Sequence, residues 1–161
     1  MLEEIEITCC GIRDVSALRT LPKLRCVDLT GNLISDITPL FACKELEKLN
    51  ASDNLICGNL EIYDMPKLKE LNLGANEIKA LTIKNAPKLE SVRIHKNQLS
   101  APPGISSGTP EVFVSGNPYI LREWLTEDEH EQIIRDILQI YFADDKAKEI
   151  CKMRSTTIRF I

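Results

Sequence analysis

Along residues 2 to 119, apolar and polar residues alternate in short runs, most of which end at an asparagine. In the run LRCVDLTGNLI, polar residues separate Leu24, Val27 and Leu29, and the pair Gly31-Asn32 follows. Alternation with a period of two is the pattern of a half-buried β-strand, and a Gly-Asn pair is typical of a turn. The pattern therefore predicts a strand of a few residues followed by a turn.

This run recurs along the chain. The aligned lines are LEEIEITCCGI, LRCVDLTGNLI, LEKLNASDNLI, LKELNLGANEI, LESVRIHKNQL and TPEVFVSGNPY. They begin at Leu2, Leu24, Leu46, Leu68, Leu89 and Thr109, so successive lines are 22, 22, 22, 21 and 20 residues apart. Self-similarity at such a period predicts a repeat protein, in which stacked strands pair in parallel and share a core that one repeat cannot bury alone.

The lines follow the pattern L-x-x-L-x-L-x-x-N/C-x-L, which resembles the leucine-rich repeat family over residues 2 to 119. The spacers IRDVSALRTLPK and LISDITPLFACKE are similar to those of phosphatase-regulator repeats and of bacterial internalins. The resemblance implies an α/β solenoid: a right-handed superhelix of about six repeats with a concave parallel sheet. We expect one domain, with the solenoid at 1–119 and a helical C-terminal cap at 120–161.

The ninth position of the lines is nearly uniform. It is occupied by Cys10, Asn32, Asn54, Asn76, Asn97 and Asn117. A side-chain amide has donors and an acceptor, so it can pair with backbone groups that the turn leaves free and can bridge neighbouring repeats. A buried polar group without a partner costs about 1–3 kcal/mol, so we expect these asparagines to form a structural ladder.

The spacers shorten along the chain. Those containing Pro66, Pro87, Pro102 and Pro103 predict extended or 3₁₀ segments on the convex side rather than full helices. In the tail, Thr126 and Glu129 have capping-box spacing, and an apolar helical face follows. At the other end, the first strand could cap itself with its outward glutamates, could belong to a longer chain, or could be covered by another molecule.

Composition narrows the function classes. The chain has 43% hydrophobic and 27% charged residues and a net charge of -4, which does not favour wrapping a phosphate backbone. There is no C-x-x-C pair, and the two histidines lie far apart, so we expect no metal site and no cofactor. The six cysteines predict reduced thiols and an intracellular location, cytoplasmic or nuclear, with Cys10 and Cys26 as small core residues.

The outward positions of the strands form three rows on the predicted concave face. Position three holds Glu4, Cys26, Lys48, Glu70, Ser91 and Glu111; position five holds Glu6, Asp28, Asn50, Asn72, Arg93 and Phe113; position seven holds Thr8, Thr30, Ser52, Gly74, His95 and Ser115. The candidate partner-binding residues are Asp28, Lys48, Asn50, Glu70, Asn72, Arg93, His95 and Phe113. An outward aromatic beside an arginine has the composition of an interface anchor, although the C-terminal tail could instead cover Phe113.

No residue combination predicts catalysis. His95 and Ser115 share a face but no acid or orienting group accompanies them, and Cys151 is best explained as a buried helix cysteine. We therefore expect a non-catalytic scaffold that binds a protein partner through its concave face, and the resemblance suggests a phosphatase or a cytoskeletal regulator as that partner. Two alternatives stay open: a component of an RNA-protein particle that acts through a protein partner, and a host-surface adhesin of internalin type.

Overall fold

The structure is a computed structural model that describes residues 2–108 and 110–118. The predicted helical cap at 120–161, including its capping box at Thr126 and Glu129, lies outside the described residues. So does any contact of the C-terminal tail with Phe113.

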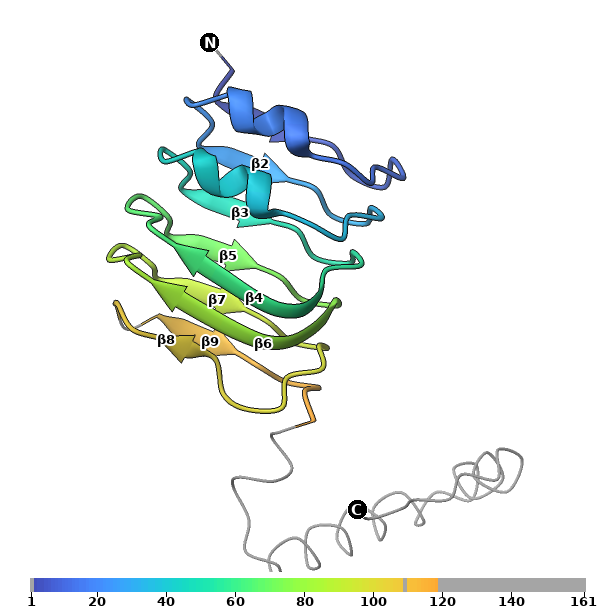
Figure 1. The fold of residues 1–161 in the computed structure, drawn as a ribbon, viewed down its shortest axis with the longest axis vertical. Coiled ribbons are helices and arrows are strands. Elements are labelled where there is room, and N and C mark those ends of the chain that lie inside the picture. Colours follow the sequence, from blue (N-terminus) through green and yellow to red (C-terminus); the bar gives the residue numbers. More distant parts are fainter. Residues whose placement is uncertain (1, 109, 119–161) are drawn as a thin grey trace, which may run out of the picture. The chain divides into compact units, whose positions relative to one another are not determined.

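The apolar runs form one parallel sheet, as the sequence predicts (Figure 1). Its strands are β1 (Glu4–Glu6), β2 (Cys26–Asp28), β3 (Lys48–Asn50), β5 (Glu70–Asn72), β7 (Ser91–Arg93) and β9 (Glu111–Phe113), in that spatial order. The register places Glu6, Asp28 and Asn50 opposite one another, and Asn72, Arg93 and Phe113 continue the same line. Equivalent positions of the repeats therefore lie side by side across the sheet.

The opposite side of the coil changes character along the chain. The first two spacers form short 3₁₀ helices, η1 (Ser16–Thr20) and η2 (Thr38–Ala42). The later spacers form a second parallel sheet of β4 (Cys57–Tyr63), β6 (Glu77–Lys84) and β8 (Gly104–Ile105). The extended convex segments are thus confirmed, whereas the expected α/β class is wrong for residues 2–108 and 110–118, which contain no α-helix.

Local sequence explains this change. Asp14 and Asp36 accept hydrogen bonds from the backbone N–H groups two residues on, which starts a tight turn. In β4, Leu60 and Ile62 are buried and alternate with exposed Glu61 and Tyr63, so period two replaces helical period. Short alternating spacers can bury their apolar side only as strands.

The core lies between the two sides of the coil. Leu29, Leu73 and Ile94, at the sixth position of their lines, have no exposed surface, and Ile34 is equally buried. Two predicted core residues are corrected: Cys10 is exposed and Cys26 is only half-buried. Cys10 lies in the turn of the edge strand β1, which only one neighbouring turn flanks, and Cys26 points to the outer face of the sheet.

The turn before each ladder position uses left-handed backbone. This eighth position has a positive φ in every line, at Cys9, Gly31, Asp53, Ala75, Lys96 and Gly116. Only glycine adopts this conformation without a steric penalty. Gly31 is further constrained, because a Cβ there would lie 2.7 Å from the sulfur of Cys9.

Candidate functional site

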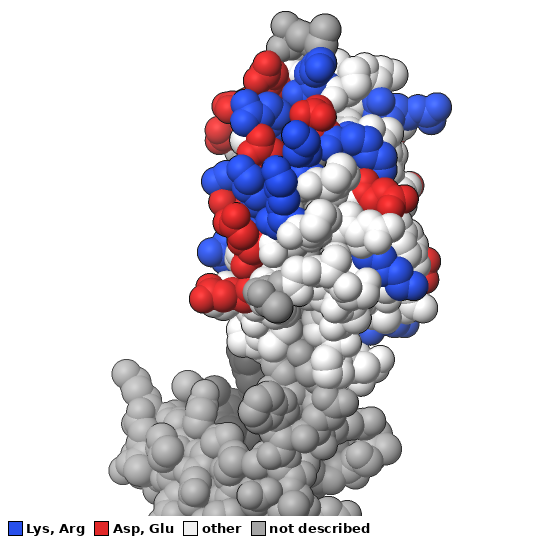
Figure 2. All heavy atoms as spheres, turned by 90° about the vertical axis from the view of Figure 1, so that its left-hand side faces the viewer, with Lys and Arg blue, Asp and Glu red and all other residues white. Residues whose placement is uncertain are grey.

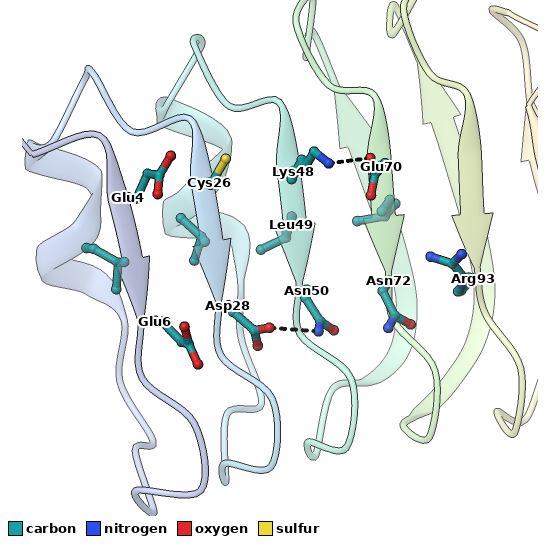
Figure 3. A pocket seen from close by; sticks show the side chains of 13 residues that line it. Glu4, Glu6, Cys26, Asp28, Lys48, Leu49, Asn50, Glu70, Asn72 and Arg93 are labelled. Atoms are coloured by element: carbon teal, nitrogen blue, oxygen red, sulfur yellow. Dashed lines mark hydrogen bonds and ion pairs between the residues drawn. The ribbon is translucent and has the colours of Figure 1, made fainter.

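The candidate site is the outer face of the six-stranded sheet, here called the concave face. A hollow runs across it from β1 to β7, and Figure 3 shows the side chains that line it. All eight candidate binding residues lie on β2 to β9 of this sheet or, for His95, two residues after β7. Six of them border the hollow: Asp28, Lys48, Asn50, Glu70, Asn72 and Arg93.

The fifth positions form a straight line that we call the central row. It consists of Glu6, Asp28, Asn50, Asn72, Arg93 and Phe113. Along it the chemistry changes in one direction, from two carboxylates through two amides to a guanidinium and an aromatic ring. The strand register alone brings these residues together, since they are distant in sequence.

At the acidic end of the row, uncharged groups donate hydrogen bonds to the carboxylate of Asp28. Asp28 accepts hydrogen bonds from the backbone N–H and hydroxyl of Thr30 and from the amide of Asn50 at 3.0 Å. Partial burial would raise the pKa of Asp28, but these hydrogen bonds together outweigh it and lower that pKa. Asp28 is therefore a firmly ionised carboxylate whose charge no described cation neutralises.

The two central amides differ in what they leave free. Asn50 uses both ends of its amide, since it donates to Asp28 and accepts from the hydroxyl of Ser52. Asn72 accepts from the backbone N–H of Gly74, while its NH₂ group has no partner among the residues that the structure describes. Asn72 therefore offers a donor on the surface of the row.

The basic end combines a cation with an exposed ring. The guanidinium of Arg93 lies 5.4 Å from the ring centroid of Phe113, within cation–π range, and Phe113 is 44% exposed. Next to Arg93, the imidazole of His95 lies over Gly74, so closely that a Cβ on Gly74 would overlap the ring. The imidazole of His95 therefore packs against Gly74, and only the lack of a side chain at Gly74 leaves room for it.

A neighbouring row on the same face contains an internal ion pair. Lys48 and Glu70, from β3 and β5, form an ion pair of 2.6 Å, and the hydrogen bond that Lys48 donates to Glu70 raises the pKa of Lys48 (Figure 3). These two predicted site residues therefore satisfy each other. The central row keeps its charges free, which makes it the stronger candidate for binding.

Sequence reasoning missed a charged column at the edge of the sheet. Glu3, Arg25, Glu47 and Lys69 precede the strands and alternate in sign, with contacts of 3.6, 2.6 and 2.7 Å between neighbours. Hydrogen bonds from Lys69 and Arg25 lower the pKa of Glu47 to about 2. Figure 2 shows acidic and basic side chains intermingled on this side. The sequence does contain a sign of this column, because charges alternate at the second position of the first four lines.

The five ladder asparagines are buried in the turn on the other side of each strand. Asn76 is representative: its NH₂ group donates to the carbonyls of Ala51 and Leu73, each at 3.0 Å, and its carbonyl oxygen accepts the N–H of Ile56. Each amide therefore ties its repeat to the preceding one. These residues are not available to a ligand.

Several other chemistries find no site in the described part of the chain. No group of histidine, cysteine, aspartate or glutamate there could hold a metal ion. The imidazole of His95 makes no hydrogen bond with any residue in 2–108 or 110–118, and all five described cysteines are free thiols. Within the same residues, no helix has the length and apolarity needed to cross a bilayer.

Comparison with known proteins rests on structure. No family model matches the sequence, and no curated protein matches it either. Among solved structures, the leucine-rich repeat domain of LRIM1 is similar, with a TM-score of 0.53 and 24% identity over 71% of this chain and 37% of that chain. InlP of Listeria monocytogenes gives a TM-score of 0.48 and 25% identity over 67% of this chain and 32% of that one.

The stacked parallel strands, the asparagine ladder and the match to LRIM1 together define a leucine-rich repeat fold. The chain aligns with about a third of the length of each of these two structures. The likeness shows the architecture, and the use of the concave face has to be argued from the residues of this chain.

Proposed function

We propose that this protein is a non-catalytic interaction module that binds a protein partner on its concave face. The observation that carries the proposal is the pair formed by Arg93 and Phe113 at one end of the central row. An exposed aromatic ring stacked with a guanidinium is the type of residue pair that anchors protein interfaces, because both bury a large area on binding.

The rest of the face supports the same function. The central row and the Lys48–Glu70 pair supply polar groups around the anchor, as expected for the rim of an interface. Three carboxylates, Glu4, Glu6 and Asp28, disfavour a nucleic acid on this surface. The phosphatase-regulator type of spacer makes a phosphatase or a cytoskeletal regulator the first partner to test.

The test is affinity capture with the full chain, followed by mass spectrometry. The variants are Arg93→Ala and Phe113→Ala. The matched control is Lys84→Ala and Tyr63→Ala, because Lys84 lies 5.5 Å from the ring centroid of Tyr63 on the convex sheet and Tyr63 is 37% exposed. The two pairs have the same chemistry on opposite sides of the coil.

We expect one set of partners to be lost with the concave variants and kept with the convex ones. Loss of at least tenfold in affinity, about 1.4 kcal/mol, is the size expected for an interface anchor. Equal capture by wild type and both concave variants would overturn the proposal, because the residue pair that carries it would then take no part in binding.

A further inference from the structure

The central row carries opposite charges at its two ends, and neither end is neutralised. Glu6 and Asp28 face each other across β1 and β2, and Arg93 stands three strands beyond Asp28. The ion pairs among the described residues all lie outside this row. The row is therefore a fixed, one-dimensional charge pattern that faces solvent.

Neighbouring residues orient these charges without cancelling them. Thr30 and Asn50 hold the carboxylate of Asp28 by neutral hydrogen bonds, and Phe113 holds the guanidinium of Arg93 by its ring face. Between them, the NH₂ group of Asn72 has no partner among the described residues. The row thus presents acceptors, then a donor, then a cation, in that order.

We propose that the central row binds an extended segment of the partner that crosses the strands, with a basic side chain against Glu6 and Asp28 and an acidic side chain against Arg93. A carbonyl oxygen of the segment accepts the free N–H of Asn72. This inference rests on the proposed function and adds the charge order of the partner. A ligand whose charges all have the same sign is attracted to one end of the row and repelled by the other, so it should bind less well.

The spacing of the strands sets the length of the segment. Neighbouring strands lie about 4.8 Å apart, so Arg93 is roughly 14 Å from Asp28 and roughly 19 Å from Glu6 along the row. An extended chain advances about 3.3 Å per residue. The basic and acidic side chains of the segment are therefore about four to six residues apart.

The experiment selects peptides from a random 12-residue display library on the full-length chain and measures the affinities of the enriched peptides by fluorescence anisotropy. We expect enriched peptides to carry a basic and an acidic residue about four to six positions apart. Glu6→Lys should weaken them at least tenfold, and affinity should fall as salt rises. Glu6 makes no side-chain hydrogen bond with the described residues, so this variant leaves the sheet intact.

A charge swap and a matched control complete the test. Changing the basic residue of the peptide to Glu should restore binding to Glu6→Lys, and changing the acidic one to Lys should restore binding to Arg93→Glu. Glu77→Lys makes the same substitution at an exposed position of β6 and should change nothing.

The inference is overturned by a library that enriches no peptide, by enriched peptides without this charge spacing, or by equal effects of Glu6→Lys and Glu77→Lys. If one of these results is found while capture still depends on Arg93 and Phe113, the inference about charge order fails and the proposed function stands. Capture that is insensitive to both concave variants removes the proposed function itself.

Discussion

Two columns of side chains run side by side along this solenoid, and one is uniform in sequence whereas the other is variable. At the ninth position the five asparagines are identical and buried, with 4–7% of their surface exposed. At the fifth position, four residues earlier in each line, the central row changes from carboxylate to amide to guanidinium to ring. Both columns have the same period, so periodicity alone does not separate structure from function.

The surroundings explain the difference. Each ladder asparagine meets the same backbone groups of its own turn and of the preceding one, and only an amide satisfies them all. The fifth position is half-buried or exposed, and residues of different chemistry occupy it in the same strand register. The uniform column therefore reports what the coil needs, and the variable column is the one for which we propose a role in recognising a partner.

The largest effect should come from breaking the ladder. Asn76→Ala leaves the buried N–H of Ile56 without a partner. It also removes one of the two amide donors to each of the carbonyls of Ala51 and Leu73, which Asn54 and Asn97 still reach. An unpaired buried group costs about 1–3 kcal/mol and a lost hydrogen bond about 0.5–1.5 kcal/mol, so we expect a loss of roughly 3 kcal/mol in the free energy of unfolding. Urea denaturation followed by circular dichroism measures it.

Asn72→Ala is the matched control, because it removes an asparagine of the same repeat from the central row. Asn72 only accepts the N–H of Gly74 and is half-buried, so we expect a loss below about 1 kcal/mol. Similar losses for Asn72→Ala and Asn76→Ala would mean that the two columns do not differ as argued.

A second change should strengthen the turn between the two columns. Ala75 has a φ of 53°, in the left-handed region. Ala75→Gly removes the penalty of a side chain there, and the added freedom of the unfolded chain offsets part of the gain, so we expect about 0.5–1 kcal/mol of stabilisation. Thermal unfolding measures it.

Gly116→Ala is the reverse change at the equivalent position, where φ is 73° and a Cβ would meet only ordinary contacts at 3.4 Å or more. It should destabilise by a similar amount. A destabilising Ala75→Gly would contradict the backbone argument.

The sequence predicted the ladder better than the surface. Asn32 and its equivalents could be placed because their environment is set by local backbone that every repeat shares. The extended convex segments also followed from spacer length and proline, but their pairing into a second sheet depends on register between repeats. Within residues 2–108 and 110–118, the α part of the expected α/β class is missing, because the described spacers form 3₁₀ turns or strands rather than α-helices.

Side-chain partnerships across repeats were the least predictable. The Lys48–Glu70 pair, the contact of Arg93 with Phe113 and the packing of His95 against Gly74 all depend on which rotamer each residue adopts over its neighbour. Cys10 was misplaced because its column is buried elsewhere, whereas its own turn lies at the edge of the sheet.

A third change tests the packing of His95 against Gly74. Gly74 does not have a positive φ, so Gly74→Ala is tolerated by the backbone, but its Cβ must displace the imidazole. We expect a stability loss of only about 0.5 kcal/mol together with a clear change in the NMR signals of His95. Ser52→Ala, at the same position two repeats before His95, should leave those signals unchanged. Unaltered His95 signals in Gly74→Ala would contradict the described contact.

The smallest effect on stability should come from the charged column at the edge of the sheet. Its members alternate in sign, so it is neither uniform like the asparagine ladder nor graded like the central row. Hydrogen bonds from Lys69 and Arg25 lower the folded-state pKa of Glu47 to about 2 from an ordinary 4.5. Its stabilisation is therefore complete above about pH 4.5 and is lost as pH falls toward 2. Arg25 and Lys69 are 51% and 38% exposed, so solvent screens the pairs.

Urea midpoints of wild type and Glu47→Gln, compared between pH 7 and pH 2.5, isolate this contribution. The wild type should be the more stable at pH 7, and the difference should shrink with acid and with added salt, because both remove the charge interaction that the variant lacks. A difference that stays constant from pH 7 to pH 2.5 would show that Glu47 acts through packing. The column would then resemble the asparagine ladder, whose role does not depend on charge.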